Sequence, residues 1–432
     1  MNLRRAIILP VLVSFALALA ACGHGGGSSN ARIRVLNAIP DAPSISLTLD
    51  TTQVVNNLGF EQATQYTGID TGSREFKVSA NGGASNVIDT TLNVSGSDYT
   101  YIVYGPVSAA LATLYVDSGF NKPNSGNFAV RFINDAAGVG NVDLYLTAPG
   151  VDITTTSATV PNVGYGAASA FTSVPDGTYE LRVTAANTKQ VVFDTGAVAF
   201  SDQQLYNIVA MTKGSAQLVD LAVLNIDDNG TGSVKQNLLG EFKVVNASSV
   251  PSPLNVSVDG ALTLSNVPYT GVSNYTITTA GQHTFTVQST ATPGSNLLTV
   301  VDTLNSATDQ SLVLTGAAGG LSAVILNDNN LPPAVGHARI RFVNSSAEFP
   351  ALDVYVNFAK EVSNLAIGSS SGYVDVTADT TIGTSFEFDF NTAGTVNPVL
   401  KVPNVTIIGG HTYTVYVMGP AASPVAVTTK DD

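Results

Sequence analysis

The chain has 432 residues, a formal net charge of −14 and only 12% charged residues. This acidic balance argues against nucleic acid and anionic lipid headgroups as partners, because both need clustered lysine and arginine. The chain has a single cysteine, so no internal disulfide can form, and each folded unit depends on the burial of apolar side chains.

The first residues have the features of an export signal. Arg4 and Arg5 precede the apolar stretch 6–19, which is too short to cross a bilayer as a stable helix. The Leu-Ala-Ala-Cys sequence that ends at Cys22 resembles the lipobox of bacterial lipoproteins, and this is the chain's only cysteine. The alternative is an ordinary secretory signal with an incidental cysteine, but lipidation accounts better for a thiol without an internal partner.

The lipobox resemblance implies that residues 1–21 are removed as a signal peptide and that Cys22 carries the lipid. Residues 22–30 are rich in glycine and serine, and we expect them to form a flexible tether. Gly23 follows the cysteine in place of the aspartate that favours inner-membrane retention. The expected location is therefore the cell envelope, at the outer membrane of a two-membrane bacterium.

A spaced pattern recurs four times after the tether. A short alternating strand ends in asparagine, and three alternating apolar residues begin eight residues later. Alternation with a period of two marks half-buried strands, and a repeat near 100 residues fits a small β domain. The recurring asparagines are Asn37, Asn134, Asn246 and Asn344.

Polar seams rich in glycine and proline divide the rest of the chain into four modules. About seven strands in each module, without an amphipathic helix, predict an all-β fold: a tandem array of four immunoglobulin-like β-sandwich modules. Short linkers that contain proline favour semi-rigid spacing, so four modules in line would reach about 130 Å from the membrane. The predicted modules are residues 31–119, 127–228, 238–328 and 337–432.

Two polar positions recur in the first strand of each module. We expect the asparagine to close the connection that follows it by bonding the backbone. We expect the cation to be a solvated charge on the outer sheet face, paired with acidic neighbours such as Asp143 or Asp353. Replacing such a cation with alanine should then cost under about 0.5 kcal/mol. The cations are Arg34, Arg131, Lys243 and Arg341.

The start of the first module, residues 34–43, resembles the opening signature of the bacterial family DUF4397, a domain of unknown function. This segment reads Arg-Val-Leu-Asn-Ala-Ile-Pro-Asp-Ala-Pro. The resemblance covers residue 31 to the C-terminus and implies a β-sandwich on an exported or anchored protein, without an established activity. Residues 341–344, 353–356 and 143–145 fit the signature, whereas residues 250–253 replace its Pro-Asp-Ala-Pro element.

No motif predicts a catalytic residue, a cofactor site or a metal site. Residues 368–372 match the nucleophile-elbow pattern, but no helix is predicted to follow, so we expect a turn. The four histidines are not at metal-binding spacing. The acidic seam 227–230 is a weak calcium candidate, with a solvated linker as the alternative. An Asp dyad across a loop stays open, because spacing in sequence says little about separation in a sandwich.

The leading hypothesis is a lipid-anchored cell-envelope protein that acts as a non-enzymatic binding, adhesion or structural module array. Its expected partners are the membrane, through the N-terminal lipid, and an envelope or surface protein or a glycan. One alternative is a secreted carboxylate-dependent hydrolase. Another is a periplasmic small-ligand carrier, which needs a deep pocket that small sandwiches seldom provide. The sequence leaves the oligomeric state open, and also whether the modules pair.

Overall fold

The computed structural model describes residues 31–213, 217–334 and 336–432. The predicted signal peptide, Cys22 and the tether lie outside these residues. Apart from one 3-10 turn, Val107–Ala109, every regular element of the described chain is a β-strand. No helix within the described ranges has the length and apolar character needed to cross a membrane. The predicted all-β fold is confirmed.

Module 1 consists of two facing sheets, with strand orders β4-β1-β7-β8 and β3-β2-β5-β6. The first strand pairs in parallel with β7, and the other neighbours are antiparallel. The module therefore has eight strands, one more than the sequence pattern predicted. The strands are β1 (Ala31–Ala38), β2 (Ser44–Leu49), β3 (Thr52–Gly59), β4 (Thr67–Ile69), β5 (Gly72–Ala80), β6 (Asn86–Val94), β7 (Asp98–Tyr104) and β8 (Leu111–Val116).

Modules 3 and 4 repeat this topology. Their sheets are β22-β19-β25-β26 with β21-β20-β23-β24, and β30-β27-β33-β34 with β29-β28-β31-β32. The strands of module 3 are β19 (Leu239–Asn246), β20 (Leu254–Val258), β21 (Ala261–Val267), β22 (Thr276–Thr279), β23 (Gly281–Ser289), β24 (Asn296–Leu304), β25 (Asp309–Thr315) and β26 (Ser322–Asp328). Those of module 4 are β27 (His337–Asn344), β28 (Ala351–Val356), β29 (Ala359–Ala366), β30 (Ser370–Thr377), β31 (Thr384–Thr392), β32 (Pro398–Ile407), β33 (Thr412–Met418) and β34 (Val425–Lys430).

Module 2 differs at the edges of one sheet. Two short strands, β12 and β13, share the place beside β9, and β18 from the following seam pairs with β17. The strands are β9 (Asn127–Asp135), β10 (Val142–Thr147), β11 (Val160–Val163), β12 (Ala167–Ala168), β13 (Thr172–Pro175), β14 (Gly177–Ala185), β15 (Val191–Phe200), β16 (Leu205–Lys213), β17 (Leu218–Asn225) and β18 (Ser233–Lys235).

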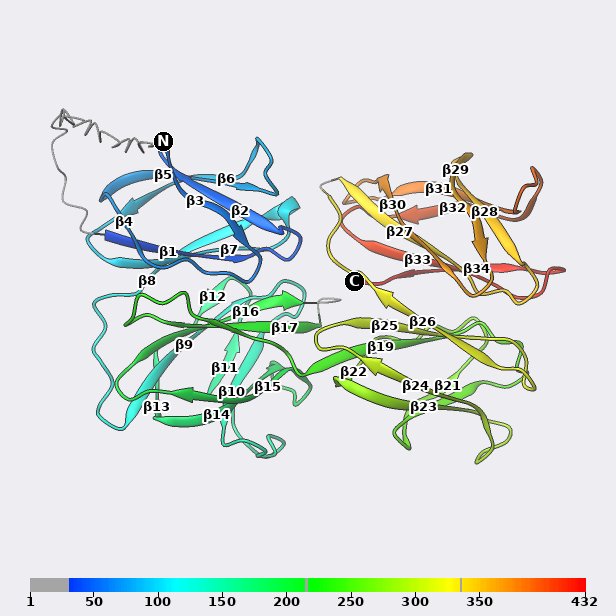
Figure 1. The fold of residues 1–432 in the computed structure, drawn as a ribbon, viewed down its shortest axis with the longest axis horizontal. Coiled ribbons are helices and arrows are strands. Elements are labelled where there is room, and N and C mark those ends of the chain that lie inside the picture. The colour runs from blue at the N-terminus through cyan, green and yellow to red at the C-terminus, as the bar shows by residue number, and fades with distance from the viewer. Residues whose placement is uncertain (1–30, 214–216, 335) are drawn as a thin grey trace, which may run out of the picture.

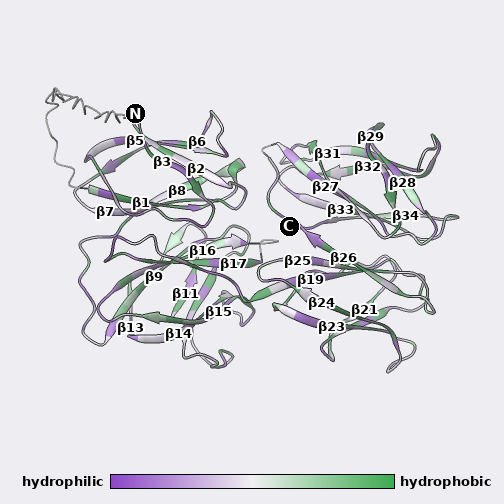
Figure 2. Cartoon of the chain, in the orientation of Figure 1, coloured by the Kyte–Doolittle hydropathy of each residue, from purple (hydrophilic) through white to green (hydrophobic). Residues whose placement is uncertain are grey.

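Each sandwich encloses its own apolar core, as the alternating pattern predicted. Hydrophobic and hydrophilic residues alternate along many strands (Figure 2). The inward residues of the four first strands are equivalent core positions with at most 1% of their surface exposed, which confirms this part of the prediction. They are Val35, Phe132, Val244 and Phe342.

The recurring asparagines close the connection after the first strand, as expected. Asn37 Nδ2 donates to the carbonyl oxygens of Ala42 and Leu58, both at 3.1 Å. Its Oδ1 accepts from the backbone nitrogen of Ile39. Asn134, Asn246 and Asn344 also donate from the side chain to backbone carbonyls of the same module.

The four modules form a two-by-two block (Figure 1), not the in-line array expected from the linkers. The β1 sheet of module 1 packs against the β9 sheet of module 2 through Leu36, Ile102, Ile133 and Val209, among others. The β19 sheet of module 3 packs in the same way against the β27 sheet of module 4. The in-line prediction was wrong because these strands are buried on both faces: every residue of β16 except the last is buried.

Candidate functional site

The recurrent cations lie buried between paired modules. They point away from their own cores, as expected, but the neighbouring module covers that face. The prediction of solvated charges paired with Asp143 or Asp353 was therefore wrong: Asp143 accepts backbone hydrogen bonds and Asp353 pairs with Lys360. The exposed fractions are 0% for Arg34, 7% for Arg131, and 2% for both Lys243 and Arg341.

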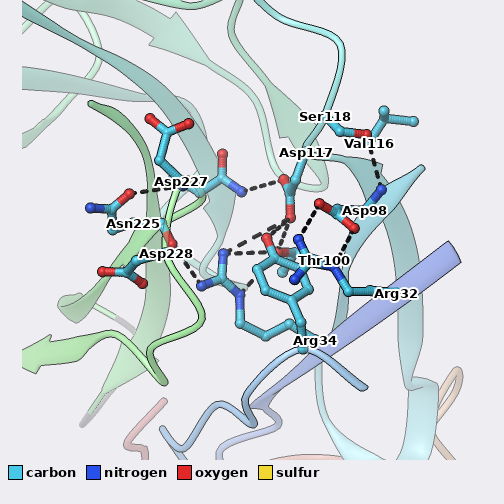
Figure 3. A network of polar contacts seen from close by, with 12 residues as sticks. Arg32, Arg34, Asp98, Thr100, Val116, Asp117, Ser118, Asn225, Asp227 and Asp228 are labelled. Atoms are coloured by element: carbon cyan, nitrogen blue, oxygen red, sulfur yellow. Dashed lines mark hydrogen bonds and ion pairs between the residues drawn. The ribbon is translucent and has the colours of Figure 1, made fainter. Parts of the chain in front are cut away.

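Asp117 is the centre of the contact between modules 1 and 2 (Figure 3). It follows β8, and its side chain is fully buried. Its Oδ1 accepts from Arg131 Nη2 of module 2 at 2.7 Å and from Asn207 Nδ2 at 2.9 Å. Its Oδ2 accepts from the hydroxyls of Tyr66 and Thr100 in module 1. One carboxylate therefore joins the two modules through four donors.

Arg34 of module 1 reaches across the same contact (Figure 3). Its Nη1 donates to the backbone oxygens of Asn225 at 2.9 Å and Gly230 at 3.3 Å. The seam 227–230, considered above as a weak calcium candidate, thus docks module 2 onto module 1. Asp227 accepts from the Leu205 backbone nitrogen, and no group of three or more acidic, histidine or cysteine side chains in the described chain could hold a metal ion.

Two ion pairs join modules 3 and 4, one in each direction. Arg341 Nη2 of module 4 contacts Asp328 Oδ1 of module 3 at 2.6 Å. Lys243 Nζ of module 3 contacts Asp431 Oδ1 of module 4 at 2.5 Å. Each module gives one cation and one carboxylate, so the contact has approximate two-fold symmetry. All four side chains are at most 3% exposed.

An aromatic ring covers each of the four cations. Such contacts add a cation–π attraction that strengthens when water is excluded. Burial lowers the pKa of Arg131. Burial also opposes the charge of Arg341, but Asp328, Tyr373 and Tyr416 together outweigh it and raise the pKa of this arginine. The cation-to-ring distances are 4.5 Å for Arg34 and Tyr66, 5.0 Å for Arg131 and Phe171, 4.7 Å for Lys243 and Tyr275, and 5.3 Å for Arg341 and Tyr373.

The sequence contains a signal for this pairing that the strand pattern alone did not reveal. In modules 1, 3 and 4 the recurrent cation pairs across parallel strands with a residue that carries a hydroxyl: Thr100, Ser311 or Thr414. This hydroxyl residue pairs in turn with a residue of the next strand, and an aspartate follows two positions later along the chain. These aspartates are Asp117, Asp328 and Asp431. Module 2 has Ile226 at this position, so Arg34 has no carboxylate from module 2 and bonds backbone oxygens instead.

Two buried carboxyl groups lie side by side in module 3. Glu241 and Asp309 pair across parallel strands and are 0% and 2% exposed. Burial, and then Glu241, raises the pKa of Asp309 well above its ordinary value. Asp309 Oδ2 accepts from Asn330 Nδ2 of the following linker at 2.9 Å. The pair lies across adjacent strands, so it is not the Asp dyad across a loop that the sequence left open, and it ties the linker to module 3.

The other sequence candidates lie in ordinary strand surroundings. Ser370 is the first residue of β30, and Ser371 Oγ accepts from the Phe342 backbone nitrogen, so the 368–372 segment enters a strand and not a nucleophile elbow. His283 bonds Asp259 and the Thr279 carbonyl oxygen. Cys22 lies outside the described residues.

All four modules line a cavity of about 760 Å³ at their junction. Pro106 comes from module 1, Thr212 from module 2, Tyr275 from module 3 and His411 from module 4. The linker between modules 3 and 4 adds Asn330. Because the cavity lies where the modules meet, strand patterns within one module gave no signal for it.

Comparison with solved structures finds distant likenesses, of which three are described. One is a family 41 carbohydrate-binding module from streptococcal virulence factors (9% identity, TM-score 0.17, covering 41% of this chain and 93% of that one). Another is a proposed cell-adhesion protein from Bacteroides uniformis (9%, 0.22, 47% and 99%). A third is a family 26 carbohydrate-binding module from Eubacterium rectale (12%, 0.17, 45% and 95%). Scores this low carry no argument about this chain.

No curated protein matches the sequence. The family described as "Domain of unknown function (DUF4397)" matches residues 31–145, 240–355 and 342–432, which together are most of the chain. The first of these matches includes the 34–43 opening segment, and the second includes both Lys243 and Arg341. The chain belongs to the DUF4397 family.

Proposed function

We propose that this chain is an exported, lipid-anchored cell-envelope protein whose four-module block binds a ligand without catalysing a reaction. The observation that carries the proposal is the junction cavity of about 760 Å³, to which every module contributes. Its volume is within the range of about 300–1,000 Å³ that is typical of small-molecule sites.

The buried ion pairs between modules support this proposal because they hold the cavity walls in place. Lys243 contributes both to the cavity and to the ion pair with Asp431, so one side chain couples module pairing to the shape of the site. A site that is already formed avoids the entropic cost of ordering its walls when a ligand binds. The deep pocket that a small-ligand carrier needs is thus supplied by four sandwiches together.

The carboxyl pair of Glu241 and Asp309 does not favour the hydrolase alternative. Glu241 is fully buried, and Asp309 is occupied by the linker residue Asn330. A general acid must lie within hydrogen-bond reach of the substrate proton that it transfers. The geometry of this pair fits a structural tie better than a catalytic dyad.

The predicted anchor has a direct test. Replacing Cys22 with serine should abolish incorporation of a palmitate analogue and release the protein from the envelope, because the chain has no other thiol. Metabolic labelling followed by membrane fractionation measures both effects. Label that persists in the variant would contradict the anchor.

The cavity is tested by native mass spectrometry of the chain purified from its own envelope in mild detergent. We expect a bound small molecule on the wild-type chain. Asn274 lines the cavity and its side chain makes no hydrogen bond to the described residues, so Asn274→Trp should fill the space and remove this molecule. Asn93→Trp, on the exposed outer strand β6, is the matched control. No bound mass on the wild type, or equal binding by the cavity variant, would contradict the proposal.

A further inference from the structure

The charges around the junction cavity come in opposite pairs. Lys243 contacts Asp431 at 2.5 Å. His411 Nδ1 lies 3.3 Å from Asp432 Oδ1, a contact that is an ion pair only when the imidazole is protonated. Lys430 lies close enough to Asp432 to lower the pKa of that carboxyl, although burial dominates and raises it. The cavity therefore has no unbalanced cluster of one sign with which to hold an ionic ligand.

Polar groups without a protein partner remain on the cavity wall. His411 Nε2 and the Asn274 amide make no hydrogen bond to the residues that the structure describes, whereas His411 Nδ1 is taken by Asp432. The amide offers both donors and an acceptor, and the imidazole nitrogen offers one or the other according to its tautomer. Such mixed, uncharged groups complement hydroxyls, which also both donate and accept.

Apolar residues line the same cavity. Pro40, Pro106 and Pro332 line the cavity together with Val272, Leu331 and the ring of Tyr275. Flat proline and aromatic surfaces suit the C–H faces of a sugar ring, while the amide and imidazole reach its hydroxyls. A purely apolar ligand would leave the His411 and Asn274 polar groups without partners, which weakens binding. A multiply charged ligand would not use the apolar surface.

We infer that the junction cavity binds a neutral polyhydroxylated ligand of the carbohydrate class. The inference rests on the proposed function and adds the chemical class of the ligand. His411 and Asn274 then act as the hydrogen-bonding residues from module 4 and module 3, and the prolines form the platform.

The test is isothermal titration calorimetry of the full chain in detergent micelles against four trisaccharides. Cellotriose and triacetylchitotriose are neutral, triglucosamine is cationic and trigalacturonic acid is anionic. We expect at least one neutral trisaccharide to bind with one site per chain, and both charged ones to bind at least tenfold more weakly. His411→Ala and Asn274→Ala should each weaken that binding about 2- to 10-fold, as expected for one lost hydrogen bond, and Asn93→Ala should leave it unchanged.

The possible failures differ. Tighter binding of a charged trisaccharide, or no binding of any trisaccharide by a chain that carries a native small molecule, overturns the ligand class and leaves the proposed function standing. No trisaccharide binding together with no native ligand overturns both. If the His411→Ala and Asn274→Ala variants bind a neutral trisaccharide as tightly as the wild type does, and unfold at the same temperature, the assignment of the site is overturned.

Discussion

Arg341→Ala is expected to lower the free energy of unfolding of the module 3–4 pair by about 3–5 kcal/mol. The substitution leaves the Asp328 carboxylate buried without its cation, with only the hydroxyls of Ser311 and Tyr275 as donors. Removing one partner of a buried ion pair costs far more than removing a surface charge, for which the sequence alone suggested under about 0.5 kcal/mol. Denaturant titration of a fragment spanning residues 238–432 measures the effect with the contact intact.

The matched control is Lys401→Ala in the same fragment. Lys401 also contacts two carboxylates, Glu387 and Asp389, but its side chain is 52% exposed. A surface pair of this kind contributes about 0–1 kcal/mol. If the Arg341 and Lys401 variants lose similar amounts of stability, the buried ion pairs are not what holds modules 3 and 4 together.

Asp135→Asn is expected to stabilise the chain by up to about 5 kcal/mol at pH 8 while changing little at pH 4. Asp135 ends β9 at the contact between modules 1 and 2, is 1% exposed, and has no hydrogen-bond partner among the described residues for either carboxyl oxygen. Burial raises its pKa from 3.8 to about 8. The asparagine imitates the protonated carboxyl in shape and neutrality, so it removes the cost of burying a charge.

The direction of the pH dependence follows from the raised pKa. The unfolded chain releases this proton near pH 3.8, whereas the folded chain keeps it to about pH 8. The stabilising contribution is therefore complete below pH 3.8 and is lost as the pH rises through about 8, by up to about 1.4 kcal/mol per pH unit. Urea unfolding at pH 4, 6 and 8 tests this, with the exposed Asp89→Asn as control. Equal pH slopes in wild type and Asp135→Asn would contradict it.

The parts of the fold predicted correctly are those that a single module determines. Alternation placed Phe132 and Phe342 in cores, and turn chemistry gave the role of Asn37, because both depend on neighbours close in sequence or on the facing sheet of the same sandwich. The recurrent cation was also assigned correctly to the face away from its own core.

What failed depends on contacts between modules. A strand covered on both faces by two different modules shows the same charged residue at the same spacing as a strand that faces water, so Arg131 and Arg341 looked like surface charges. The signal that distinguishes them is spread over three strands. It consists of the cation, a polar residue paired with it on the parallel strand, and an aspartate two residues after the partner of that polar residue on the third strand. Such a combination can be recognised only when the parallel pairing of the first and seventh strands is known.

The central claim is that buried ion pairs join module 1 to module 2 and module 3 to module 4, and that the two pairs form one block around a shared cavity. Small-angle X-ray scattering of residues 31–432 tests it most directly. A compact block of this length should have a radius of gyration of about 21–26 Å. A maximum dimension near 130 Å, the length estimated for four modules in line, would show that the modules do not pair in solution and would contradict both the block and the junction site.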